Sequence, residues 1–282
     1  MGTVVRIVAS LVVLAVLGYG AYWLSINGDF SRGILENTID TGEFLTLEAR
    51  FTPEEIMQAQ AGNLLGDEAH KYLEPALHFF PFLLMEVKYS RSDRRTAEGM
   101  MLWSLQDGEM VINTDTWEMT HGFEDCITAD ATSNDFKVIN SLATNGGAMD
   151  RDQLQRALHV EPDVLQPWLD SARRKHLIVQ RGNVYRLHFA DPKIQVNPQT
   201  KFTHWLVTKP YKHARRLPPK YSKAQVRRIS EAAFGGDFAI RSEKEVYLPV
   251  YSIVVLNPDG TQLTSFWNAL NGQPVNSLSL AN

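Results

Sequence analysis

Basic side chains dominate one stretch of the chain and predict a surface that binds an anion. Residues 173–228 contain fifteen Lys or Arg and a single acid, Asp191. Such a density of cations attracts nucleic acid, lipid headgroups or an acidic protein surface. We expect the anion or partner to be bound by ten of these residues: Lys209, Lys212, Arg215, Arg216, Lys220, Lys223, Arg227, Arg228, Arg181 and Arg186.

The remainder of the chain supplies a competing explanation for that charge. Residues 27–172 hold 26 acids against 10 bases. Part of the basic stretch could therefore lie against acidic residues of the same molecule or of a neighbouring copy. Both interpretations stay open on the sequence alone.

One local cluster has the residue types of a nucleophilic catalyst. The segment HGFEDC places the imidazole of His121 five residues before Cys126, the single cysteine of the chain. A thiol and an imidazole can form a nucleophile–base pair, so a hydrolase using Cys126 and His121 is an alternative. A lone thiol is more often a small buried side chain, and we expect no enzyme.

Residue spacings typical of metal or phosphate sites are missing. The eight histidines are scattered, with no His-Glu-x-x-His and no second cysteine to build a zinc site. The pair Gly146-Gly147 is not followed by Lys-Ser or Lys-Thr, so no phosphate-binding glycine loop is present. We therefore expect no metal and no cofactor.

An internal repeat gives the architecture that carries these residues. Residues 79–113 and 247–276 both begin with aromatic-apolar-Pro, and both close on Trp-x-x-x-Asp/Asn-Gly. Upstream of each lies a capping box, Thr52-x-x-Glu55 or Ser222-x-x-Gln225, which begins a helix. The sequence predicts an α+β fold with two copies of a helix-plus-antiparallel-sheet unit. We expect the copies to pack together, because an isolated hairpin is marginally stable in water.

A different pattern separates the copies. Residues 134–189 predict three helices followed by a hairpin around Gly182-Asn183, and this order resembles the winged-helix family. In members that bind DNA, the third helix enters the major groove through its amino-terminal end. Here that end carries Glu161 and Asp163, which a polyanion would repel. We favour a winged helix used for protein contacts, with a nucleic-acid-binding regulator as the alternative.

The amino terminus predicts a membrane anchor. Residues 7–26 carry no charge, and twenty apolar residues suffice to cross the hydrocarbon layer. The expected anchor residues are Ile7, Leu14, Leu17, Tyr22 and Trp23, the last two as interfacial aromatics. A cleaved signal peptide is the alternative. The short basic tail before the apolar run favours an inner-membrane protein with its carboxyl-terminal region outside the cytoplasm, in the periplasm; the alternative is a cytoplasmic region.

These patterns combine into one expectation for the whole chain. The expected parts are a transmembrane anchor (1–27), a first repeat copy (28–132), a winged-helix-like insertion (133–190), a basic linker (191–221) and a second repeat copy (222–282). The expected function is that of a non-enzymatic, single-pass membrane protein. It would serve as an accessory or scaffold subunit of an envelope membrane complex through protein–protein contacts, with anionic lipid as a further partner.

Overall fold

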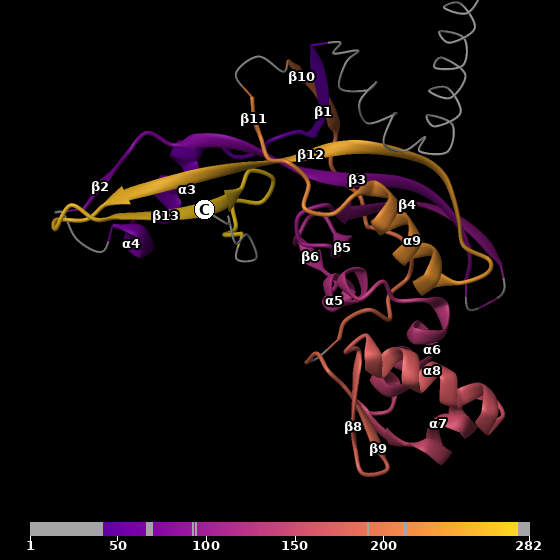
Figure 1. Cartoon of the computed structure of the whole chain (residues 1–282). Helices are drawn as coiled ribbons and strands as arrows, with labels where there is room; N and C mark the ends of the chain where they lie inside the picture. Colours follow the sequence, from indigo (N-terminus) through magenta and orange to yellow (C-terminus); the bar gives the residue numbers. More distant parts are fainter. Residues whose placement is uncertain are drawn as a thin grey trace, which may run out of the picture. The chain divides into compact units, whose positions relative to one another are not determined.

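The computed structural model describes residues 42–65, 70–91, 93, 95–190, 192–210 and 214–275. The chain divides into two units between Glu43 and Phe44, and nearly all described residues belong to the second, Phe44–Asn282. The second unit is a mixed α/β structure built around a curled sheet (Figure 1).

The sheet contains ten strands among the described residues. Its main path runs β10 (Leu206–Pro210), β1 (Glu43–Leu47), β12 (Ala239–Leu256), β3 (Ala76–Ser90), β4 (Thr96–Ser104), β5 (Met110–Asn113) and β6 (Glu118–Met119). Three strands lie off this path: β11 (Arg215–Arg216) pairs with β3, whereas β2 (Lys71–Tyr72) and β13 (Gln262–Asn268) pair with β12. The long antiparallel strands β3 and β12 form its centre.

The two repeat copies are related by a pseudo-two-fold axis between β3 and β12. Pro81 pairs with Tyr247 and Phe79 with Pro249, so that each Pro faces the aromatic residue that opens the other copy's motif. We call the turn from Trp103 to Gly108, and its counterpart from Trp267 to Gly272, the corner of each copy, and the two corners are attached alike. Leu105 N donates to Pro81 O at 3.0 Å, and Ala269 N donates to Pro249 O at 3.1 Å.

The copies exchange their helices. Helix α3 (Pro53–Ala59) packs Ile56 against Ile253 and Trp267 of the second copy. Helix α9 (Lys223–Phe234) buries Val226 and Ile229 in the cluster that holds Trp103 of the first copy. Each copy therefore completes the core of the other, which is why the two pack as one structure.

Helix caps fix where both exchanged helices begin. The side chains of Thr52 and Ser222 each accept a hydrogen bond from the backbone N–H of the third helical residue. In return, the side chains of Glu55 and Gln225 accept from the backbone N–H of Thr52 and Ser222, as the sequence predicts. The preceding residues are anchored across the axis. Phe51 N donates to Ala269 O at 3.0 Å, and Tyr221 N donates to Leu105 O at 2.9 Å.

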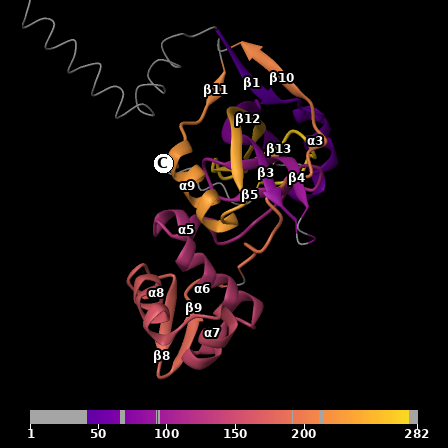
Figure 2. The same ribbon diagram turned by 90° about the vertical axis from the view of Figure 1, so that its right-hand side faces the viewer.

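The insertion follows the first copy and forms its own small core. It contains α6 (Ser133–Thr144), β7 (Ala148–Asp150), α7 (Arg151–Leu158), α8 (Pro162–Arg174), β8 (Ile178–Arg181) and β9 (Val184–Leu187), with a three-stranded sheet in the order β7-β9-β8. Helix α5 (Phe123–Thr128) leads into it, and both α5 and α6 contact α9 (Figure 2). Phe123 joins the two parts, because its ring lies 4.8 Å from Trp103 and 6.0 Å from Phe136.

The membrane expectation is wrong for the structure as described. Among residues 42–65, 70–91, 93, 95–190, 192–210 and 214–275, no helix combines the length and the apolar character needed to cross a bilayer. The anchor predicted over residues 1–27, with Ile7, Leu14, Leu17, Tyr22 and Trp23, lies outside these residues. This finding overturns the transmembrane element of the expected fold, and with it the single-pass inner-membrane protein with a periplasmic region.

Candidate interaction surface

Most of the basic stretch is neutralised within the molecule. Eight of its fifteen cations form ion pairs with carboxylates: Arg173 with Asp170, Lys175 with Asp135, Lys193 with Glu118, Lys201 with Asp115, Lys220 with Glu124, Lys223 with Glu245, Arg227 with Glu243, and Arg228 with Asp130. Four of these cations, from Lys220 onward, belong to the expected anion-binding set. The acidic and basic parts of the chain thus face each other, and this uses cations that an external anion would need.

The remaining expected cations of the linker do not form one site. Lys212 lies outside the described residues, and Lys209 is exposed on β10. Arg215 and Arg216 form β11, whose partner is β3. The Arg216 guanidinium lies over the rings of Phe44 and Tyr247, at 5.6 and 5.9 Å from their centroids, and so caps an aromatic cluster.

Two expected arginines do come together, on the hairpin of the insertion. Val179 pairs with Arg186 and Arg181 pairs with Val184, so these four side chains share one face of β8 and β9. The other face is buried through Ile178 and Tyr185. We call Val179, Arg181, Val184 and Arg186 the hairpin face. Val179 is 43% exposed, and neither arginine forms an ion pair within the described residues.

Acidic groups border the hairpin face. Asp150 on β7 pairs with Val184, although its side chain also caps α7 by accepting from Gln153 N at 2.8 Å. Helix α8 begins after Glu161 and has Asp163 in its first turn. A phosphate backbone approaching this end of α8 would meet carboxylates, as the sequence predicts.

A second cluster of charges surrounds the corner of the first repeat copy. Glu109 is 8% exposed and accepts hydrogen bonds from Thr120 Oγ1 at 2.6 Å and Gly122 N at 2.8 Å. Burial raises the pKa of Asp107 to about 6, and burial also raises the pKa of Glu109. Lys220 Nζ contacts Glu124 Oε1 at 2.7 Å beside them. These groups hold α5 and the start of α9 on the corner.

The candidate nucleophile is not built for catalysis. Cys126 is fully buried in the core, and burial together with Glu109 and nearby acids raises the pKa of its thiol far above the usual range. His121 is exposed, and its backbone forms a bridge with Lys193. A buried, protonated thiol is a poor nucleophile. Within the described part of the chain, no group of His, Cys, Asp and Glu side chains is arranged to hold a metal ion.

Two exposed apolar residues escaped the sequence interpretation. Trp205 is 75% exposed just before β10, and its carbonyl accepts from Glu48 N. Val179 and Arg181 are two residues apart on one strand, so their side chains point to the same face. The hairpin turn at Gly182-Asn183 was the sequence signal that could have shown this. For Trp205 the signal was weaker, since a lone aromatic in a polar segment is as often buried.

Comparison of the chain with protein-family models, with curated proteins and with solved structures finds no match.

Proposed function

We propose that this protein works by binding a protein partner through the hairpin face, as an accessory or scaffold component of a complex. The observation that carries the proposal is that Arg181 and Arg186 stand beside the exposed Val179 without a carboxylate partner among the described residues. Arginines among exposed aliphatic side chains are typical of protein interfaces, where lysine is depleted.

The distribution of the other charges supports a protein over a nucleic acid. Binding to nucleic acid draws on several cations that contact phosphates, but eight cations of the basic stretch are already paired with carboxylates. Glu161 and Asp163 at the start of α8 would in addition repel the phosphates of a nucleic acid. A partner that presents a few carboxylates around an apolar centre would match the hairpin face.

The alternative keeps one supporting observation. The two arginines of the hairpin lie diagonally on one face, a placement suited to phosphates on a nucleic-acid backbone. A regulator that binds nucleic acid through this hairpin would need those same two residues. The two functions therefore differ in the ligand rather than in the site.

A cross-linking experiment separates these functions. A photoreactive amino acid at position 179, in cells that express the full chain, should yield an adduct with one protein. Arg181→Glu together with Arg186→Glu should abolish the adduct, and the same label at Asn63, an exposed residue of α4 (Ala61–Leu64), should not give it. Absence of a protein adduct that depends on both arginines would refute the proposal.

Nucleic-acid binding is measured alongside, with the purified chain and a 20-base-pair DNA duplex at about 50 and 200 mM salt. We expect a dissociation constant weaker than about 10 μM at the higher salt, with no loss on charge reversal. Tight binding that weakens steeply with salt, and disappears in the double charge-reversal variant, would establish the alternative instead.

A further inference from the structure

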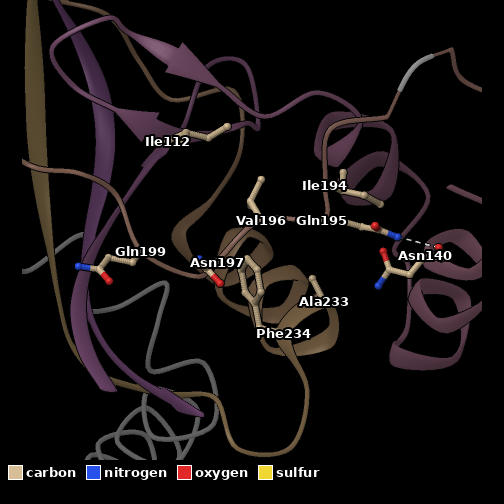
Figure 3. A pocket seen from close by; sticks show the side chains of 9 residues that line it. All are labelled: Ile112, Asn140, Ile194, Gln195, Val196, Asn197, Gln199, Ala233 and Phe234. Atoms are coloured by element: carbon tan, nitrogen blue, oxygen red, sulfur yellow. Dashed lines mark hydrogen bonds between the residues drawn. The ribbon is translucent and has the colours of Figure 1, made fainter. Parts of the chain in front are cut away.

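We propose that a pocket between the insertion and the sheet binds a short, uncharged peptide segment. The pocket has a volume of about 640 Å³, within the range of small-ligand sites. Its walls come from α6, α9, β5 and the segment that follows the hairpin (Figure 3). The proposal rests on the proposed function as a protein-binding protein, and it names a second contact, whose lining contains none of the four residues of the hairpin face.

The lining is neutral and rich in carboxamides. Four lining residues are amides (Asn140, Gln195, Asn197 and Gln199), and the other five are apolar (Ile112, Ile194, Val196, Ala233 and Phe234). The absence of charge in this lining disfavours an ionic ligand, because a charge needs a partner when it leaves water.

Two of these amides are held in place by the protein. Gln195 Nε2 donates to Asn140 O at 2.7 Å and to Thr144 Oγ1 at 2.6 Å, which fixes its side chain on α6. Gln199 Oε1 accepts from Tyr89 OH at 2.7 Å. Gly99 permits this approach, since a Cβ there would lie 2.9 Å from Gln199 Cγ. The amides are thus ordered before any ligand arrives.

Hydrogen-bonding groups remain open in this pocket. Asn140 Oδ1 is buried and has no hydrogen-bond partner. Within the described residues, Gln195 Oε1, Gln199 Nε2 and the side chain of Asn197 likewise form no hydrogen bond. Asn140 Oδ1 has almost no accessible surface, so the groups that a ligand can reach are Gln195 Oε1, Gln199 Nε2 and the amide of Asn197, all on exposed residues.

A peptide supplies the complementary groups. Each peptide unit has one N–H donor and one C=O acceptor, and a carboxamide has one acceptor oxygen and an NH₂ donor. In an extended peptide the N–H and C=O of one residue point to the same side, so Gln195 Oε1 can accept from an N–H, Gln199 Nε2 can donate to a C=O, and the Asn197 amide can do both. Phe234, Val196 and Ile112 would receive small apolar side chains of the peptide. Peptide backbone against amides, with apolar side chains against Phe234, accounts for the whole lining.

The test uses the full chain labelled with ¹⁵N in its Asn and Gln side chains. The probe is the capped tetrapeptide N-acetyl-Ala-Thr-Val-Ala-amide. We expect saturable shifts of the side-chain amide signals of Asn140, Gln195, Asn197 and Gln199, with a dissociation constant below about 1 mM. Peptides of the same length that carry two Glu or two Lys should bind at least tenfold more weakly.

Matched substitutions on one helix locate the binding. Ala233→Trp places a large side chain at the pocket and should weaken peptide binding at least tenfold. Ala224→Trp adds the same side chain at an exposed position near the start of α9, outside the pocket lining, and should leave binding unchanged. Equal affinities in the two variants would overturn the proposal.

Other outcomes also decide it. No saturation by the uncharged peptide, or equal binding of the charged peptides, would refute a neutral peptide site. Shifts caused by N-acetylglucosamine and not by the peptide would identify a saccharide pocket instead. The charge reversals Arg181→Glu and Arg186→Glu should not affect peptide binding, so loss of the hairpin-face adduct and loss of peptide binding are failures of separate proposals.

Discussion

The two repeat copies share one backbone design but differ in what lies over their corners. In the first copy, Trp103 is fully buried and its indole Nε1 donates to Gly108 O at 2.8 Å. In the second copy, Trp267 is 5% exposed and donates instead to Ser265 Oγ at 2.8 Å. Helix α5 and the insertion cover only the first corner. The repeat therefore supplies the common backbone, and the first corner is in addition the place where α5 and the insertion are attached.

The chemistry of the corners follows the same division. Asp107 and Glu109 of the first copy stand where the second copy has Asn271 and Gln273, at the same spacing from the Trp-x-x-x-x-Gly pattern that both copies contain. At the first corner the Glu109 carboxylate accepts hydrogen bonds from Gly122 N and Glu124 N at the start of α5. Neutral amides suffice at the second corner. Charge at the first corner is therefore tied to attachment of the insertion.

Truncation of the two tryptophans should give the largest difference between the copies. Trp103→Ala removes a ring packed on Phe123, and we expect the free energy of unfolding to fall by about 4–5 kcal/mol. Trp267→Ala, in the smaller cluster with Ile56, should cost about 3 kcal/mol. Urea unfolding followed by circular dichroism measures both. Equal losses would contradict the view that the insertion adds packing to the first corner only.

The corner glycines form a second matched pair. Gly108 has a φ of 69° and Gly272 a φ of 67°, and any other residue in this left-handed region costs about 1–2 kcal/mol. A Cβ at Gly108 would also meet Ile127 and Tyr221 at 3.0 and 3.1 Å, whereas at Gly272 the nearest contact is 3.5 Å.

We therefore expect Gly108→Ala to cost about 2–4 kcal/mol and Gly272→Ala about 1–2 kcal/mol in the free energy of unfolding, by the same urea assay. A Gly272→Ala variant at least as unstable as Gly108→Ala would show that the second corner is also covered.

The local elements could be predicted from the sequence because their signals are local. The capping boxes at Thr52 and Ser222, and the turn at Gly182-Asn183, are set by residues a few positions apart, and the structure has a helix or hairpin at each. Exchange of α3 and α9 between the copies could not be predicted. It depends on contacts such as Ile56 with Trp267, between residues far apart in the sequence, and either pairing of helix and hairpin satisfies the same pattern.

The candidate site was predictable only in part, for an electrostatic reason. The count of cations correctly indicated a basic stretch, and the acidic remainder indicated a possible internal partner. Which cations stay free depends on pairings such as Arg228 with Asp130 and Arg227 with Glu243, and the tertiary fold decides them. Arg181 and Arg186 share a face through hairpin register, which the sequence did contain.

A pH experiment tests the carboxylate at the first corner. Because burial raises the pKa of Asp107 to about 6 from an ordinary 3.8, the folded state binds this proton more tightly than the unfolded chain. The stabilising contribution is complete below about pH 4, the ordinary Asp value. It is lost as the pH rises through about 6. Asp107→Asn should therefore raise stability at pH 7.5 by about 1–2 kcal/mol and flatten its dependence between pH 4 and 7.

The matched change in the second copy is Asn271→Asp. No insertion covers that corner. Asn271→Asp should therefore lower the free energy of unfolding at pH 7.5 by less than Asp107→Asn raises it. Urea midpoints at pH 4.5, 6 and 7.5 measure both variants. If Asp107→Asn leaves the pH dependence as it was, the carboxyl group is not the one that titrates.

The smallest expected effect concerns the cations that precede the two exchanged helices. Lys220 and Arg50 are equivalent, since Lys220 N donates to Leu105 O at 2.9 Å and Arg50 N donates to Ala269 O at 2.8 Å. Lys220 also pairs with Glu124, with side chains 57% and 46% exposed, and pairs this exposed contribute about 0–1 kcal/mol. Lys220→Met should therefore lower stability by less than about 1 kcal/mol, and added salt should shrink the loss because it screens the pair.

Lys220 has a further effect that Arg50 lacks, because its charge lowers the pKa of Asp107. Lys220→Met should thus move the Asp107 transition of stability upward, whereas Arg50→Met should leave that transition unchanged, because the charge of Arg50 lowers the pKa of His204 instead. The readout is the pH midpoint of the urea denaturation curves, compared between the two variants. An equal shift in both would mean that the cation acts through net charge, and that the link between the insertion and the first corner is not electrostatic.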